Sequence, residues 1–277
     1  MGVTTIIDRV QFRLDFRHWK EFPQFRSDQG LGRVALIAFV LSSIFTIHAL
    51  ALSIIVLDKL GVTNSPSLTS SAPLFLSTER LTLLIQWILY VLTLCIFHLS
   101  EFFVTALYNP TVVNASSFVV NHSKSYTIAM MVSWTEFFIR FFIFPSLNSV
   151  KFAVVGMIFV VIGQAVRSLA MITCGESFNH IIQNFKKKNH VLVTSGIYNY
   201  LRHPSYFGFF YWSIGTQMMT GNFLTSICFA AASWTFFKRR IPFEEGTLMK
   251  IFPEDYPTYQ QKTIIGIPFI KTYLKTD

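Results

Sequence analysis

Residues 190–208, which read HVLVTSGIYNYLRHPSYFG, hold the densest group of side chains that could bind a polar ligand. Tyr198 and Tyr206 offer flat aromatic faces, which suit an aromatic base or a cation. Arg202 and His203 add hydrogen-bond donors and positive charge. Tyrosines are also common where helices leave a membrane, but an aromatic belt does not explain the His-Pro-Ser sequence among them. We therefore interpret this stretch as one wall of a ligand site.

A helix is predicted to begin at Pro204, because proline fixes its own φ and is favoured at the first helical position. The free N–H groups of Ser205, Tyr206 and Phe207 would then point back toward the preceding loop. Such a helix end favours a negative group, such as a carboxylate or a phosphate. The first wall is thus expected to combine an anion-binding helix start with aromatic faces.

A second polar stretch, residues 240–245, carries Arg240, Glu244 and Glu245. Arginine can bind a carboxylate through two parallel hydrogen bonds, so Arg240 is a candidate clamp for an anionic substrate group. A carboxylate here could hold hydroxyl groups or an amine. Pro242 is predicted to start a helix, which would place both glutamates in its first turn, where negative charge is favourable. Alone, the stretch is equally well explained by such electrostatics beside a membrane-flanking basic run.

The composition is that of an integral membrane protein. The chain has 277 residues, 52% of them hydrophobic and 13% charged, with 30 phenylalanines and a mean hydropathy of +0.48. Soluble domains carry about 25% charged residues, so most of this surface must face an apolar medium. The formal net charge is +9, but the positive residues flank apolar segments, so we expect no nucleic-acid partner. The three cysteines are scattered without CxxC spacing, which predicts neither a disulfide framework nor a metal site.

The apolar segments predict an all-α polytopic membrane protein with about six membrane segments. A cytosolic N-terminal segment, residues 1–33, precedes them and lacks the apolar core of a signal peptide. Transmembrane helices are expected within 34–173, and the region 174–277 holds both polar stretches and a cytosolic tail. The predicted segments are residues 34–57, 81–99, 127–144, 152–173, 206–219 and 223–237.

The last two segments are short for straight spans, and they predict a helical hairpin over residues 206–237 with Gly221 and Asn222 at its turn. Such a hairpin returns the chain to the side that it left. It would therefore bring residues 202–206 beside residues 238–245. The two polar stretches are thus expected to form two walls of one pocket at the membrane surface.

The placement of lysine and arginine orients the chain. The N-terminal segment, the region 174–205 and the tail are the most basic parts, so both termini and the pocket are expected in the cytosol. Two N-x-S sequons, at Asn114 and Asn121, would then also face the cytosol and remain unglycosylated.

Ionisable residues also occur inside the predicted spans. Glu136 and Arg140 lie four residues apart, so they are expected to share a helix face and pair. Arg167 lies near the cytosolic end of the fourth segment, with Gln164 one turn earlier. Structural pairing or snorkelling is expected for each of these residues rather than catalysis.

At these positions the chain closely resembles the isoprenylcysteine carboxyl methyltransferase family. The matching stretches are SFNH at 177–180, HVLVTSGIY at 190–198, RHPSYFG at 202–208, WSIGTQ at 212–217, RIP at 240–242 and EE at 244–245. The RHPxY element alone also occurs in phospholipid N-methyltransferases and, more loosely, in membrane sterol reductases, whereas the full ordered series is specific. The chain departs from the family in having Pro253 where relatives often have glycine, and in six predicted segments where larger relatives have up to eight.

The resemblance implies S-adenosylmethionine as the cofactor, with Arg240 binding the substrate carboxylate. The positions that match the family's cofactor pocket are Gln183, His190, Val191, Leu192, Val193, Tyr198, His203, Pro204, Ser205, Tyr206 and Glu244. The implied reaction methylates the α-carboxylate of a prenylated cysteine in CaaX proteins after their proteolysis, such as small GTPases. Residues 174–277 would then be the catalytic region, and the implied location is the endoplasmic reticulum membrane.

The implied reaction needs no general base, because an α-carboxyl group with a pKa of about 3.5 is already ionised at neutral pH. Three alternatives stay open at this point. A phospholipid N-methyltransferase shares the RHPxY wall but must deprotonate an amine. An NADPH-dependent sterol reductase belongs to another reaction class, and a non-catalytic membrane scaffold or receptor would fit the phenylalanine-rich helices alone.

Overall fold

Six long helices and one short helix make up most of the described chain. The computed structural model describes residues 30–62, 77–120, 124–180, 182 and 191–273. The helices are α4 (Leu31–Lys59), α6 (Thr78–Tyr108), α7 (Lys124–Phe142), α8 (Val150–Cys174), α9 (Pro204–Met219), α10 (Phe223–Ile251) and α11 (Asp255–Lys262). Between them lie loops, short 3-10 turns and an isolated β-bridge. The all-α prediction is therefore confirmed for the described residues, and each predicted apolar segment coincides with one long helix.

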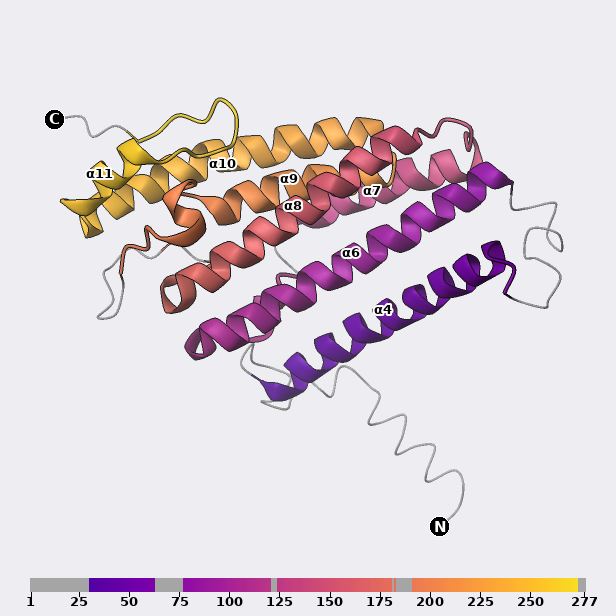
Figure 1. Ribbon diagram of the computed structural model, residues 1–277, viewed down its shortest axis with the longest axis horizontal. Coiled ribbons are helices and arrows are strands. Elements are labelled where there is room, and N and C mark those ends of the chain that lie inside the picture. The colour runs from indigo at the N-terminus through magenta and orange to yellow at the C-terminus, as the bar shows by residue number, and fades with distance from the viewer. Residues whose placement is uncertain (1–29, 63–76, 121–123, 181, 183–190, 274–277) are drawn as a thin grey trace, which may run out of the picture.

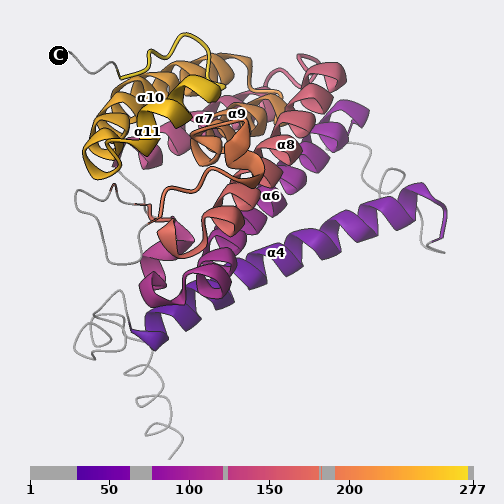
Figure 2. The same cartoon turned by 60° about the vertical axis from the view of Figure 1, so that its left-hand side comes forward.

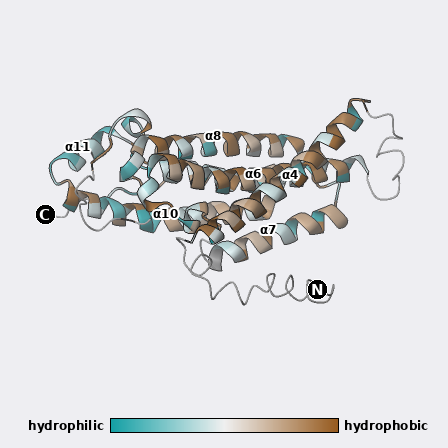
Figure 3. Ribbon diagram, turned by 90° about the horizontal axis from the view of Figure 1, so that it is seen from below, coloured by the Kyte–Doolittle hydropathy of each residue, from teal (hydrophilic) through white to brown (hydrophobic). Residues whose placement is uncertain are grey.

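Three helical stretches are long and apolar enough to cross a membrane: Leu31–Lys59, Thr78–Tyr108 and Val150–Ser177. Figure 3 shows apolar residues along the bundle and hydrophilic residues at α11. The chain is thus a helical membrane protein. The count of six membrane segments stays a prediction, because α7 and α9 have only 19 and 16 residues.

The polar stretches meet at one end of the bundle. α6, α8 and α10 end there, α9 begins there, and α11 lies alongside (Figure 1). α4 packs against α6 but diverges from the remaining helices, as Figure 2 shows. Its buried side chains are Leu41 and Ile55. The pocket described below is accordingly built from the part of the chain that follows α4.

Glycines bring α8 and α9 into close contact. A Cβ atom built on Gly163 would lie 2.6 Å from the Gly208 carbonyl oxygen, and one built on Gly208 would lie equally close to Gly163. Gly215 meets Gly156 in the same way, with a built Cβ 2.7 Å from its carbonyl oxygen. Small residues that let backbones approach are a common basis of helix packing in membranes. The start of α9, which carries the first polar wall, is thereby fixed relative to α8.

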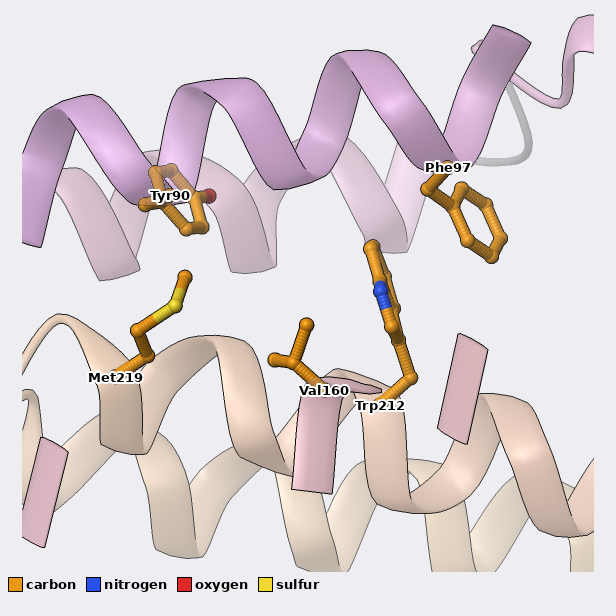
Figure 4. Close-up of a cluster of buried hydrophobic side chains, with 5 residues drawn as sticks. All are labelled: Tyr90, Phe97, Val160, Trp212 and Met219. Atoms are coloured by element: carbon orange, nitrogen blue, oxygen red, sulfur yellow. The ribbon is translucent and has the colours of Figure 1, made fainter. Parts of the chain in front are cut away.

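A buried cluster joins α6 to this helix pair. Figure 4 shows Tyr90 and Phe97 of α6 facing Val160 of α8 and Trp212 and Met219 of α9. The Phe97 and Trp212 rings are stacked with their centroids 4.1 Å apart. Stacking of this kind adds about 1 kcal/mol to the packing of the two side chains. The cluster therefore holds three helices in register beside the pocket.

The turn between α9 and α10 is held by α7. Gly221 adopts a φ of +75°, which confirms the predicted turn position. Arg140 donates to the Thr220 carbonyl oxygen at 3.0 Å, and Glu136 accepts from the Thr225 N–H at 2.7 Å. Glu136 and Arg140 lie on one helix and interact electrostatically, but no direct ion pair joins these two described residues, because each side chain satisfies the backbone at one side of the turn.

α10 continues through Pro242, contrary to the prediction that this proline begins a helix. The helix runs over Phe223–Ile251, so Glu244 and Glu245 lie near its end and not in a first turn. Pro242 leaves one helical carbonyl without its partner, but tertiary packing outweighs this loss. Ile241 is fully buried in a cluster with side chains of α9. The second arm of the hairpin is consequently longer than predicted.

The last described residues, 263–273, form a non-helical segment with a turn at residues 267–269, which we call the strap. It begins with a backbone bridge between Leu201 and Ile264. Ile265 and Ile267 are buried against α9 and α10, and Figure 1 shows the strap running back over α10. The strap therefore ties the segment before α9 to the end of α10.

Candidate active site

A pocket opens where the two polar stretches meet. Residues 202–206 and α10 contribute to it directly, so their predicted proximity is confirmed. The lining side chains include Arg167, Cys174, residues 177–180, residues 191–193, Tyr198, residues 202–206, Phe209, Phe236, Phe237, Arg240, Glu244, Thr247, Leu248, Phe252, Tyr256 and Tyr259. All predicted site residues that the structure describes are among them. Gln183 and His190 lie outside the described residues.

The Tyr206 hydroxyl connects the two charged residues of the second wall. It donates to the Glu244 carboxylate and accepts from Arg240 Nε at 2.8 Å. Arg240 Nη2 also donates to the His180 carbonyl oxygen at 2.8 Å. Within the described part of the chain, neither Arg240 nor Glu244 forms an ion pair. The pocket thus presents a cation and an anion whose charges are available to a ligand.

Glu245 is fully buried and, unlike Glu244, is not among the residues that line the pocket. It accepts from Arg202 Nε at 2.6 Å and from the Tyr273 N–H at 2.7 Å, with Gln260 Nε2 at 3.1 Å and His203 Nε2 at 3.2 Å. Burial alone would raise its pKa, but these hydrogen bonds and the positive neighbours hold the pKa at about 2. The two adjacent glutamates therefore differ in role: Glu245 fixes the wall, and Glu244 faces the pocket.

The start of α9 differs from the prediction. The helix begins at Pro204 as expected, but the N–H groups of Tyr206 and Phe207 both bind the His203 carbonyl oxygen, at 3.1 and 3.0 Å. Of the three N–H groups expected to be free, these two are occupied, because the residue before the helix turns its carbonyl over the first turn. The anion-binding argument for this helix end is accordingly weakened. The His203 ring instead stacks on Tyr206 with centroids 5.6 Å apart.

The sequence did not predict the buried ion pair between Glu101 and Arg167, a residue that lines the pocket. Glu101 of α6 binds Arg167 of α8 at 2.5 and 2.8 Å, and His180 Nε2 lies 2.9 Å from the same carboxylate. Arg167 also donates to the Ser205 hydroxyl at 3.0 Å. Arg167 had been expected to have a structural partner, but Glu101 stands far from the motifs along the chain. A lone carboxylate within an apolar span is the signal that would have indicated it.

Two tyrosines of α11 complete the pocket. Tyr256 and Tyr259 pack with Phe252, Leu192 and Tyr198 in one cluster. The Tyr259 hydroxyl donates to the Tyr198 carbonyl oxygen at 2.7 Å. Neither tyrosine is among the site residues predicted from the sequence. Among the described residues, no group of three or more His, Cys, Asp or Glu side chains is placed to hold a metal ion.

These features define a class: a helical membrane protein with a polar and aromatic pocket at one end of its bundle. The sequence profile of the isoprenylcysteine carboxyl methyltransferase (ICMT) family matches residues 154–250. Protein-S-isoprenylcysteine O-methyltransferases match as well. The Saccharomyces cerevisiae protein is 41% identical over 66% of this chain and 79% of its own length, and the Dictyostelium discoideum protein is 44% identical over 66% and 77%. The chain belongs to the ICMT family.

A solved structure supports the same assignment. The eukaryotic intramembrane Ras methyltransferase ICMT superposes with a TM-score of 0.68 and 37% sequence identity, covering 87% of this chain and 84% of the other. The Xenopus laevis methyltransferase is 48% identical over 66% of this chain, but the match spans 64% of that protein. The match to the human protein, at 44% identity, likewise spans 64% of its length.

Proposed function

We propose that this protein transfers a methyl group from S-adenosylmethionine to the C-terminal α-carboxylate of a prenylated cysteine, forming a methyl ester. The acceptors would be CaaX proteins after proteolysis, such as small GTPases. The names of the relatives support this reaction, and the solved relative is described as a Ras methyltransferase. The observation that carries the proposal is Arg240, a pocket arginine whose hydrogen bonds go to neutral oxygens and leave its charge for a substrate carboxylate.

The chemistry of the pocket lining supports the proposed cofactor. Aromatic side chains of Tyr198, Tyr256 and Tyr259 offer faces for a flat base. Glu244 accepts from a neutral phenol and forms no ion pair within the described residues, so it can attract a cationic group. When bound, S-adenosylmethionine supplies an electrophilic methyl group on a positively charged sulfur. The predicted cofactor positions Val191 to Val193 and His203 to Ser205 line the same pocket and would form its remaining walls.

The residues act by positioning. The acceptor carboxylate is ionised at neutral pH, so no side chain has to remove a proton. Arg240 would orient it through its guanidinium, which is itself fixed by Tyr206 and the His180 carbonyl. Opposite charges disappear as the ester forms, and water stabilises separated charges more than neutral products. A pocket enclosed by Phe209, Phe236 and similar apolar side chains therefore favours the reaction.

The prenyl chain of the substrate is expected to reach the pocket from the membrane. A prenyl chain partitions into the bilayer and would reach the pocket between helices, past apolar side chains such as Phe236 and Phe237. We place the enzyme in the endoplasmic reticulum membrane as a multi-pass protein of about six segments, with both termini and the pocket in the cytosol. The methyl ester has lost one negative charge, so the modified protein should bind the membrane more tightly.

The test is an assay with purified protein, radiolabelled S-adenosylmethionine and N-acetyl-S-farnesylcysteine. We expect a base-labile methyl ester. The matched control is the amide of the same prenylcysteine, which has no carboxylate and should remain unlabelled. Label in phosphatidylethanolamine in place of the prenylcysteine would indicate a phospholipid N-methyltransferase. Absence of any base-labile ester would exclude the proposed reaction.

A further inference from the structure

Tyr256 carries a buried hydroxyl group that has no hydrogen-bond partner among the described residues. The residue is 1% exposed and lines the pocket. Its hydroxyl makes no hydrogen bond to any other described residue. Tyr259, on the same helix and in the same cluster, provides an internal comparison, because its hydroxyl donates to the Tyr198 carbonyl oxygen at 2.7 Å.

An unpartnered buried hydroxyl costs free energy, and such groups in proteins nearly always find a partner. Tyr256 lines the pocket, its ring packs with Phe252, Tyr259, Leu192 and Tyr198, and its charged neighbours are Glu245, Arg202 and Glu244. Burial raises the pKa of this phenol, so it keeps its proton and remains a hydrogen-bond donor. A ligand in the pocket that offers an acceptor would therefore complete the site.

We propose that Tyr256 is a cofactor-binding residue whose hydroxyl donates a hydrogen bond to the adenosine part of S-adenosylmethionine. This inference rests on the proposed function. The ring nitrogens of adenine and the oxygens of ribose are acceptors, and the surrounding side chains, Leu192, Tyr198 and Phe252, suit a flat base. The charged methionine part needs charged partners, and Glu244 supplies one on α10.

The substitution Tyr256→Phe removes only the hydroxyl group. We expect the Kd for radiolabelled S-adenosylmethionine to rise about tenfold, as for loss of one buried hydrogen bond. The ligand-free protein should unfold at an unchanged or higher temperature, because the deleted group has no partner. The matched control is Tyr259→Phe, which should lower the unfolding temperature through loss of its bond to Tyr198, with a smaller effect on Kd.

The binding of 5′-methylthioadenosine, which has the adenosine part without the amino acid, assigns the contact. Tyr256→Phe should raise the Kd for 5′-methylthioadenosine by the same factor. An unchanged Kd for both ligands, or a fall in unfolding temperature equal to that of Tyr259→Phe, would overturn the proposal. If only the binding of S-adenosylmethionine is weakened, the hydroxyl contacts the methionine part, and the adenosine assignment is refuted.

A wild-type protein that binds the cofactor but forms no prenylcysteine ester would refute the proposed function and leave the Tyr256 result intact. A wild-type protein that binds neither ligand would refute both.

Discussion

The carboxylate of Glu101 binds the guanidinium of Arg167 through two hydrogen bonds, of 2.5 and 2.8 Å, although the residues stand on different helices, α6 and α8. The pair is almost fully buried. Arg167 continues the contact to Ser205 at the start of α9, and His180 binds the same carboxylate from the loop after α8. One ion pair thus links three helices to the residues that line the pocket.

Breaking this pair should be costly. Glu101→Gln leaves the Arg167 charge buried without compensation, so we expect the free energy of unfolding to fall by about 3 kcal/mol. The double substitution Glu101→Gln with Arg167→Gln should recover part of the loss, because it removes the unpaired charge. Thermal unfolding of the wild type, the double variant and both single variants, Glu101→Gln and Arg167→Gln, in one detergent measures the coupling. Additive losses would show that the two side chains do not depend on each other.

Arg240→Ala should raise the KM for N-acetyl-S-farnesylcysteine by about 10- to 100-fold, the effect of losing a charged hydrogen bond. The Kd for S-adenosylmethionine should change much less, since the arginine is assigned to the substrate carboxylate. The neighbouring and exposed Arg239 gives the control Arg239→Ala, for which we expect nearly wild-type kinetics. A larger effect on the cofactor than on the prenylcysteine would show that the two walls are assigned to the wrong ligands.

Acid should destabilise the protein through Glu245. Its folded-state pKa of about 2 lies below the value of about 4.3 expected for an unfolded chain. A lowered carboxyl pKa contributes stability above the unfolded value, and this contribution of about 3 kcal/mol is lost as the pH falls from about 5 toward 2. Glu245→Gln should therefore be less stable at pH 7 and show a shallower loss across this range. The exposed Glu254→Gln is the control for removal of one carboxylate. Parallel curves for wild type and Glu245→Gln would contradict the assignment.

The contact of Gly163 with Gly208 predicts that added volume separates α8 from α9. Gly163→Ala should destabilise the protein by about 1 to 3 kcal/mol, because its Cβ would meet backbone rather than a flexible side chain. The exposed Val161 on the same helix offers the control Val161→Ala, which should have little effect. Thermal unfolding distinguishes the two. Equal changes in the unfolding temperature of both variants would mean that the close approach of Gly163 to Gly208 does not limit the packing of α8 on α9.

Glycosylation mapping tests the orientation. The wild-type sequon at Asn114 follows α6, which ends at the pocket end of the bundle, and should remain unmodified if that end is cytosolic. Pro66→Ser would create a sequon at Asn64, which lies between α4 and α6 in the sequence, and this sequon should be modified in microsomes. Glycosylation of Asn114 in place of Asn64 would show that the chain has the reverse orientation in the membrane.

The local sequence pattern was sufficient to predict the helices and the proximity of the two polar walls. Both predictions depend on neighbouring residues, namely the apolar runs and the turn at Gly221. The prediction that a helix begins at Pro242 failed, because the preference of proline for helix starts takes no account of the packing of Ile241 on α9. Glu101 was missed for a related reason. Its meaning depends on Arg167, which is distant along the chain and close only after folding.

The strap, residues 263–273, is synthesised after every helix of the bundle. Glu245 draws one of its hydrogen bonds from the backbone of Tyr273, and Arg202 donates to Thr263 and Thr272. During biosynthesis, the helices can thus be inserted and packed while the wall around Arg202 is still unfinished. Only when Tyr273 has left the ribosome and folded back can the wall take its final form. The order of translation therefore places completion of this wall after the synthesis of α11.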